Sequence, residues 1–272
     1  MVKIRWTGAA GVEFTEGGKT ILIDPYHSRP GKFEVFFGRP EPKSNVINRY
    51  LEKLPGRLSA IIAGHTHFDH VLDIPEFAKH LECPLIGSNS LETLMALHGK
   101  PGIVIVCKGG ERVELPGGAA VTMIRSRHGL VLFGKAPYPG EINPENCLPM
   151  KASDYRVGDV YMPKLEMGGT VFMHAGSANF IEPEIDGHHC DVLFMCVPGW
   201  KKIPEYCTRL PEILQPKIII PFHYDDFSSP MPEDGKARNL PFQDMPGFLK
   251  RIAESAPKAE IRMIRPFESM TV

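Results

Sequence analysis

Four apolar runs in this chain each lead into a histidine. The runs are residues 58–63, 119–124, 170–173 and 217–222, and the histidines that follow them are His65, His128, His174 and His223. Runs of this length and composition are typical of buried strands. Because strand interiors fill a core while the loops at strand ends carry function, the pattern predicts that ligand-type side chains gather along one edge of a sheet.

The rest of the chain alternates strand and helix patterns. Residues 2–6 and 12–14 alternate apolar and polar positions, and Gly17-Gly18 predicts a hairpin turn into a strand that ends at Asp24. Further strands are predicted at residues 84–87, 103–106, 111–115, 191–197 and 260–264, and helices at 45–54, 90–98, 206–214 and 245–253. The two halves echo each other, which favours two sheets face to face with helices outside them, in a single α/β (α+β) domain of residues 1–272.

A helix is also expected directly after His70. Ile74, Phe77, Ala78 and Leu81 repeat at the spacing of one helical face, with Asp73 as the predicted N-cap. Three segments rich in proline, glycine and basic residues interrupt the pattern, at residues 26–44, 130–169 and 225–244. The first is expected to be either a long loop over a site or a solvated excursion. The second could gate a site or equally form an oligomer contact, and the basic residues of both could bind an anionic group on the substrate.

Composition limits the function classes. The chain has 31 basic and 32 acidic residues, which gives no electrostatic case for binding nucleic acid or an anionic membrane surface. No apolar run approaches the length of a transmembrane helix, and charges stand where a signal peptide would need its apolar stretch. The six cysteines form no Cys-x-x-Cys pair, so we expect reduced, structural thiols and a cytoplasmic protein.

The strongest chemical signal is the stretch from His65 to His70. It places His65, His67, Asp69 and His70 within six residues after a buried strand. Imidazole and carboxylate are the ligands that zinc and similar ions prefer, so this density favours a metal site over a solvated turn. Asp24, at the end of another apolar strand, is either a turn former before Pro25 or an acceptor that orients a metal-bound histidine.

With His128 and His223 downstream, the His65-x-His67-x-Asp69-His70 motif resembles that of the metallo-β-lactamase-fold hydrolases. Within that superfamily the chain most resembles the metal-dependent hydrolases of the ascorbate-6-phosphate lactonase type, and residues 219–224 are a main reason. The resemblance implies a four-layer αββα sandwich with a dinuclear centre. It assigns His65, His67 and His128 to the first metal, Asp69, His70 and His223 to the second, and Asp24 to a place behind them.

One position departs from the family pattern. Where the family usually has Gly-Asp with a bridging carboxylate, this chain has Gly176-Ser177. A neutral hydroxyl is a poor replacement, because repulsion between two divalent ions at short range in a low-dielectric site is worth several kcal/mol. We therefore expect Ser177 to be at most a weak ligand and the second ion to bind weakly or not at all, unless Asn179, Glu182 or His174 compensates.

The working hypothesis is a hydrolase that uses zinc, or alternatively manganese or iron, to acidify a water molecule to a pKa of roughly 7. Asp69 is the candidate catalytic residue that orients this water, and His174 is a candidate for the surrounding shell. The expected substrate is a small anionic ester, lactone or phosphoester. A mononuclear iron enzyme of sulfur or oxygen chemistry, a nuclease of the same superfamily, a non-catalytic relative and a homo-oligomer all stay open.

Overall fold

The alternating pattern at the start of the chain folds into an antiparallel meander. The structure is a computed structural model that describes residues 1–272 except 81–82, 132, 233–235 and 242. Its first strands are β1 (Lys3–Gly8), β2 (Gly11–Glu16) and β3 (Lys19–Ile23). Gly17 and Gly18 both have positive φ, at 55° and 73°, as the predicted hairpin turn between β2 and β3 requires.

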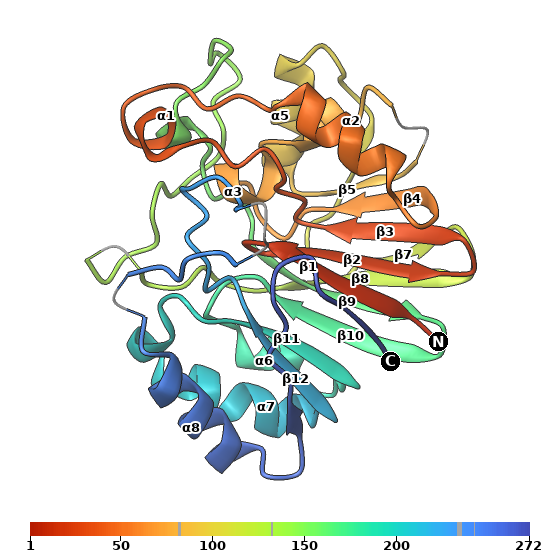
Figure 1. The fold of residues 1–272 in the computed structure, drawn as a ribbon, viewed down its shortest axis with the longest axis vertical. Helices are drawn as coiled ribbons and strands as arrows, with labels where there is room; N and C mark the ends of the chain where they lie inside the picture. Colours follow the sequence, from red (N-terminus) through yellow and green to blue (C-terminus); the bar gives the residue numbers. More distant parts are fainter. Residues whose placement is uncertain (81–82, 132, 233–235, 242) are drawn as a thin grey trace.

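Fourteen described strands form two seven-stranded sheets. The first has the order β14-β1-β2-β3-β4-β5-β6 and the second β13-β12-β11-β10-β9-β8-β7 (Figure 1). The remaining strands of the first sheet are β4 (Arg57–Ile62), β5 (Leu85–Gly87), β6 (Val104–Val106) and β14 (Ser269–Thr271). Those of the second are β7 (Arg112–Leu115), β8 (Ala119–Arg125), β9 (Tyr161–Met167), β10 (Thr170–Ala175), β11 (Val192–Cys196), β12 (Ile218–Phe222) and β13 (Glu260–Ile261).

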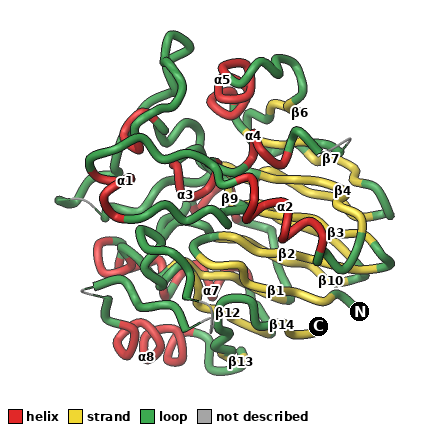
Figure 2. Tube along the Cα trace, turned by 45° about the horizontal axis from the view of Figure 1, so that its top comes forward, coloured by secondary structure: helices red, strands yellow, loops and turns green. Residues whose placement is uncertain are grey.

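Alternate side chains of each strand serve two different layers. Ile21 and Ile23 enter the core between the sheets, whereas Leu22 belongs to the cluster under the outer helices. In the core between the sheets, the ring centroids of Phe14 and Phe172 are 5.0 Å apart. One helical layer contains α2 (Ser44–Glu52), α4 (Ile74–Phe77) and α5 (Asn89–Leu97), and the other α6 (Glu182–Ile185), α7 (Arg209–Leu214) and α8 (Met245–Ser255) (Figures 1 and 2). The expected αββα sandwich is confirmed.

Two local predictions need correction. The helix expected after His70 is broken into α3 (Phe68–Val71) and α4, and Leu81 lies outside the described residues. Asp73 precedes α4, but its side chain makes no cap hydrogen bond, because Asp73 itself is helical, with φ −87° and ψ −13°. Its buried carboxylate instead accepts the N–H groups of His27 and Ser28.

The segment expected to be irregular from 130 to 169 is irregular only to residue 160. Strand β9 occupies Tyr161–Met167 and pairs with β8 and β10. A proline such as Pro163 is unfavourable inside a strand because it has no N–H to donate. The pairing of β9 with β10 ends at Lys164, so the missing N–H of Pro163 costs little there. The sequence patterns also missed α1 (Lys32–Phe36), α6, β14 and the 3₁₀ helices at Ala152–Asp154 and Trp200–Lys202. The helix expected over residues 206–214 is divided into a 3₁₀ helix, Pro204–Cys207, and α7.

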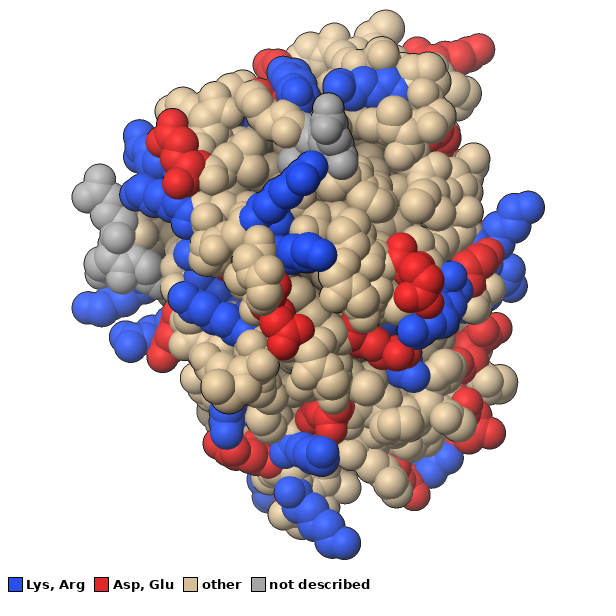
Figure 3. All heavy atoms as spheres, turned by 90° about the vertical axis from the view of Figure 1, so that its right-hand side faces the viewer, with Lys and Arg blue, Asp and Glu red and all other residues tan. Residues whose placement is uncertain are grey.

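The two termini lie together at one end of the sandwich, where Val2 and Val272 exchange backbone hydrogen bonds, and irregular segments gather at the other end (Figures 1 and 2). On the face in Figure 3 basic and acidic side chains are intermixed. Among the described residues, every helix is too short or too polar to cross a membrane.

Candidate metal centre

The carboxyl ends of strands from both sheets meet at the loop-rich end of the molecule. Strands β3 and β4 run parallel in the first sheet, as do β10, β11 and β12 in the second. Strand β8 shares the direction of β10, because β9 is antiparallel to both. The predicted site residues follow β3, β4, β8, β10 and β12, so parallel pairing within each sheet and packing between the sheets bring distant parts of the chain to one place.

His65, His67 and His128 form the first cluster. Their candidate ligand atoms lie within 4.8 Å of one another, and His65 Nε2 is 3.1 Å from His67 Nδ1. His67 Nε2 donates a hydrogen bond to the Pro137 carbonyl at 3.0 Å, and His128 Nδ1 donates to the Gly129 carbonyl at 2.8 Å. A carbonyl only accepts, so these bonds fix the protons and leave His67 Nδ1 and His128 Nε2 as lone-pair donors.

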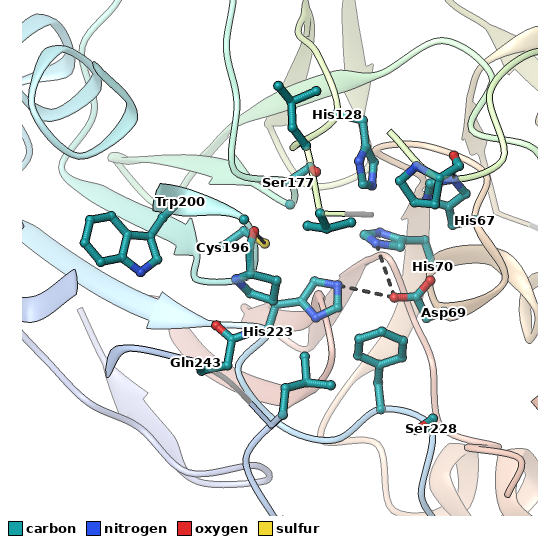
Figure 4. A pocket seen from close by; sticks show the side chains of 18 of the residues that line it. His67, Asp69, His70, His128, Ser177, Cys196, Trp200, His223, Ser228 and Gln243 are labelled. Atoms are coloured by element: carbon teal, nitrogen blue, oxygen red, sulfur yellow. Dashed lines mark hydrogen bonds and ion pairs between the residues drawn. The ribbon is translucent and has the colours of Figure 1, made fainter. Parts of the chain in front are cut away.

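Asp69, His70 and His223 form the second cluster, and their candidate ligand atoms also lie within 4.8 Å of one another. Asp69 Oδ2 lies 3.3 Å from His223 Nε2 and 3.8 Å from His70 Nε2, as the dashed lines in Figure 4 indicate. All three residues are buried. Buried charged or polar groups at this density are costly unless something compensates them.

Asp24 lies behind the second cluster and ties it to the first motif. Its Oδ2 accepts the Nδ1–H of His70 at 2.8 Å, and its Oδ1 accepts the backbone N–H of Gly64 at 2.6 Å. A Cβ added at Gly64 or at Gly176 would lie 3.1 Å from Asp24 Oδ2, so both glycines allow the backbone to approach this carboxylate closely. Asp24 and His223 both have positive φ, at 49° and 62°, a strained backbone that is typical of functional positions.

His174 and Ser177 take positions unlike those of the six clustered residues. His174 is fully buried, donates from Nε2 to the Ala10 carbonyl, and keeps its Nδ1 4.0 Å from Asp24 Oδ2 without a hydrogen-bond partner in the described part of the chain. The Ser177 hydroxyl oxygen lies in the same pocket as the clusters but accepts the backbone N–H of Gly129 at 2.9 Å. Ser177 thus fixes the backbone next to His128, and its role as a ligand stays a prediction.

Burial sets the protonation of the first cluster. It lowers the pKa of His65 well below its usual value, that of His67 to about 3 and that of His128 to about 4. Burial also disfavours protonated His70, but the carboxylates of Asp24 and Asp69 outweigh it and raise the pKa of His70. Although burial opposes ionisation of Asp69, the neighbouring His70 and His223 hold its pKa below the usual range. The first cluster is therefore neutral imidazole and the second contains an ionised carboxylate.

These shifts predict how acid destabilises the metal-free protein. His67, His128 and the buried His27, whose pKa is lowered to about 3 chiefly by burial, take up protons near pH 6.5 only in the unfolded chain. Because the unfolded state then binds more protons, the free energy of unfolding should fall by about 2 kcal/mol per histidine from pH 7 to pH 5. The raised pKa of His70 acts in the opposite direction, so the net loss is smaller than the sum.

Urea unfolding at several pH values measures this dependence. His27 packs against Tyr50 and Phe77 and belongs to neither cluster. His27→Phe should therefore remove the contribution of one histidine to the fall in the free energy of unfolding, and so make its pH dependence shallower. A free energy of unfolding that does not change between pH 7 and pH 5 would contradict the prediction.

The donor set fits a divalent metal ion. The nitrogens of His65 and His67 face each other, and three of the histidines have their other ring nitrogen held by a carbonyl or carboxylate. This second contact fixes a tautomer, as is usual for metal-binding histidine. Three imidazoles suit zinc, and two imidazoles with a carboxylate suit zinc, manganese or iron.

A pocket of about 580 Å³ opens directly onto the clusters. It includes His67, Asp69, His70, His128 and His223 in its wall (Figure 4). The wall also contains residues to which sequence reasoning gave no role, namely Phe36, Cys196, Trp200, Phe227 and Leu240. The sequence did contain a signal for Cys196, because this residue ends an apolar strand, as several of the predicted metal ligands follow one. We interpreted its thiol as structural.

The long segment before β9 contacts the site, which is one of the two roles considered for it. Pro137 accepts from His67, and the ring centroid of Tyr138 lies 6.2 Å from that of His67. Thr66, between the first two histidines, donates its N–H to Val157 O and its hydroxyl to Arg156 O. The segment therefore positions the motif through backbone groups and forms part of the pocket wall.

Three basic residues of the first long segment make contacts outside the pocket wall. Arg29 pairs with Asp225, Lys32 with Asp226, and Arg39 donates to the Pro149 carbonyl. Within the described residues, the cationic side chains in the pocket wall are Lys201 and Lys202, which sequence reasoning did not single out. The basic residues expected to bind an anionic substrate are therefore not the ones that the fold brings to the site.

Comparison with known proteins identifies the fold and family. The profile of the beta-lactamase superfamily domain matches residues 3–223. A UPF0173 metal-dependent hydrolase of Anaeromyxobacter sp. (strain K) is 29% identical over 238 residues, which cover 83% of this chain and 75% of that protein. One from Pyrobaculum arsenaticum is 26% identical over 245 residues, covering 87% and 91% of the two chains.

Solved structures agree with this architecture. Igni18, a metallo hydrolase from Ignicoccus hospitalis, superposes with a TM-score of 0.62 at 17% identity, covering 99% of this chain and 97% of the other. The metallo-beta-lactamase fold protein YhfI from Bacillus subtilis gives a TM-score of 0.62 at 13% identity over the full length of both. With the profile match across most of its length, the chain belongs to the beta-lactamase superfamily.

Proposed function

We propose that this protein is a metal-dependent hydrolase that binds one or two divalent ions at the edge where the two sheets meet. The observation that carries the proposal is the pair of clusters, His65-His67-His128 and Asp69-His70-His223, of which all but the half-buried His128 are buried, next to a pocket large enough for a small molecule. The curated relatives are named metal-dependent hydrolases, which supports the same class. An ester, lactone or phosphoester is the proposed substrate, and the likeness to the lactonase-type group stays a prediction.

A bound divalent ion in this superfamily arrangement would supply an acidified water molecule and a Lewis acid. The protein's own part begins with Asp69, whose ionised carboxylate faces both the pocket and His223 and can hold a water proton by hydrogen bonding. Asp24 keeps the His70 ring in the tautomer that leaves Nε2 a lone-pair donor. The Pro137 carbonyl accepts the Nε2–H of His67 and so leaves His67 Nδ1 as the lone-pair donor.

Purified protein tests the proposal through elemental analysis and a substrate panel. Neutral esters, lactones and phosphodiesters are assayed after loading with zinc and, separately, with manganese. Turnover that requires metal and disappears with a chelator is expected for at least one class. Metal binding at both clusters without turnover of any class would contradict the proposed hydrolysis and favour a non-catalytic binding protein, and iron as the sole bound metal would favour the oxygen or sulfur chemistry.

Because position 177 is a serine and not an aspartate, we predict that the two clusters bind metal ions with unequal affinity. Without a bridging carboxylate, two ions would share the charge of Asp69 alone, so we expect one ion to resist dialysis and the second to be lost. Ser177→Asp, at a buried position in the pocket wall, should raise the affinity for the second ion by at least tenfold, measured by metal titration against a chromophoric chelator. Two ions retained by the unaltered chain after dialysis would show that the hydroxyl is no handicap.

A further inference from the structure

The pocket beside the metal clusters has walls that are mainly apolar. Away from the ligand residues, the walls consist largely of aromatic and aliphatic side chains, including Phe36, Phe68, Leu130, Trp200, Phe227 and Leu240. They come from α1, α3, the segment before β9, the 3₁₀ turn after β11 and the loop after β12. Segments distant in the sequence thus contribute the same kind of surface to one cavity.

Charge at the pocket is nearly balanced apart from the ligand residues. Its charged side chains in the described part of the chain are Lys201, Lys202 and Asp244. Lys201 and Asp244 form an ion pair of 2.7 Å, so they neutralise each other. Lys202 is then the remaining lysine in the wall, and a single lysine gives an anionic group a less specific partner than the bidentate guanidinium of an arginine.

The mouth of the pocket extends the apolar surface outward. Phe36 on α1 lines the pocket and is 64% exposed, so its ring adds apolar surface at the pocket mouth. Val131, also in the wall, is 44% exposed. Phe37, next to Phe36 in the sequence, is 81% exposed but does not line the pocket, which makes it a matched position for comparison.

We propose that this site selects a neutral ester or lactone whose acyl part is an alkyl or aryl group of about six carbons or more. The proposal rests on the hydrolase function proposed above and replaces the anionic substrate that the sequence led us to expect. The carbonyl would lie at the clusters, and the apolar group would fill the space between Phe36, Trp200 and Leu240. Each methylene buried there contributes about 0.8 kcal/mol, which is roughly a fourfold gain in kcat/KM.

A matched pair of p-nitrophenyl esters tests the selectivity. The hexanoate and the adipate monoester have the same chain length and differ in a terminal methyl or carboxylate. For the metal-loaded enzyme, kcat/KM should rise from acetate to butyrate to hexanoate and fall at least tenfold from hexanoate to the adipate monoester. Phe36→Asp should lower kcat/KM for hexanoate at least fivefold with little effect on acetate, and the control Phe37→Asp should leave both unchanged.

Binding to the metal-free protein separates this inference from the hydrolase proposal. Methyl hexanoate and monomethyl adipate are titrated while tryptophan fluorescence is followed, since Trp200 lines the pocket and Trp6 is buried in the core. We expect methyl hexanoate to bind at least tenfold more tightly. Tight binding of methyl hexanoate without any turnover would refute the hydrolase function and leave the apolar specificity standing. Turnover with a flat chain-length series, or a preference for the adipate ester, would overturn the apolar specificity alone.

Discussion

Replacing His67 by alanine is expected to reduce turnover to the level of the metal-free protein while the fold is retained. His67 Nδ1 lies 3.1 Å from His65 Nε2, and His67 is one of the three histidines that form the first cluster. Its loss would leave two nitrogens where three define the site and would remove the ring that Pro137 orients. We expect a loss in kcat/KM on the order of 10³-fold or more, since hydrolysis at neutral pH then lacks the acidified water.

Three measurements make this test specific. Steady-state kinetics gives the loss of activity, metal titration gives the lost affinity, and circular dichroism shows whether the fold persists. His189→Ala is the matched control, because His189 is exposed and lies outside both clusters. Near-normal kcat/KM for His67→Ala with full metal content would show that this histidine does not hold the ion.

Replacing Arg29 by methionine should destabilise the protein by about 3–5 kcal/mol. The Arg29 and Asp225 side chains are only 2% and 1% exposed, and Nη1 lies 2.7 Å from Oδ2. Arg29 also donates to the Asp226 carbonyl at 2.9 Å, so it holds the segment just after His223. Removing one partner leaves the other charge buried and unpaired, and this unpaired charge is the source of most of the loss.

Urea unfolding of a double-mutant cycle measures this effect. Asp225→Asn keeps an acceptor for the Ala9 N–H and removes the charge, so Arg29→Met combined with Asp225→Asn should recover part of the stability lost in Arg29→Met. Arg112→Met breaks an ion pair with Glu166 that is largely exposed and should cost about 1 kcal/mol or less. Equal losses for Arg29→Met and Arg112→Met would mean that the buried pair contributes no more than a surface pair.

The sequence predicted much of the architecture because the spacing of apolar residues and the positions of glycine and proline are local properties of the chain. Alternation at Ile21, Leu22 and Ile23 distributes side chains to two layers, and the glycines at 17 and 18 permit the hairpin. The failures occurred where a distant partner overrode local preference. Asp73 has the chemistry of a cap, but the N–H groups of His27 and Ser28 lie within reach in the folded chain and take its carboxylate.

The metal motif could be read from spacing, since His65, His67, Asp69 and His70 lie within six residues of one another. Their grouping with His128 and His223 required knowledge of a related family, because no local pattern says which strand ends meet. In the structure, parallel pairing within each sheet and packing of one sheet on the other bring these residues within ligand distance. The geometry also shows what the Ser177 hydroxyl contacts, which its residue type alone could not.

By itself, the sequence determined the residue types available for chemistry and the strands that present them. Only the tertiary structure decided which charges reach the pocket. Arg29 and Lys32 occur in the segment expected to cover the site, yet Asp225 and Asp226 hold them away from it, while Trp200 and Leu240 line the cavity. The physical reason is that a charge's partner and a pocket's wall are set by contacts between segments up to about 200 residues apart, which periodicity along the chain does not encode.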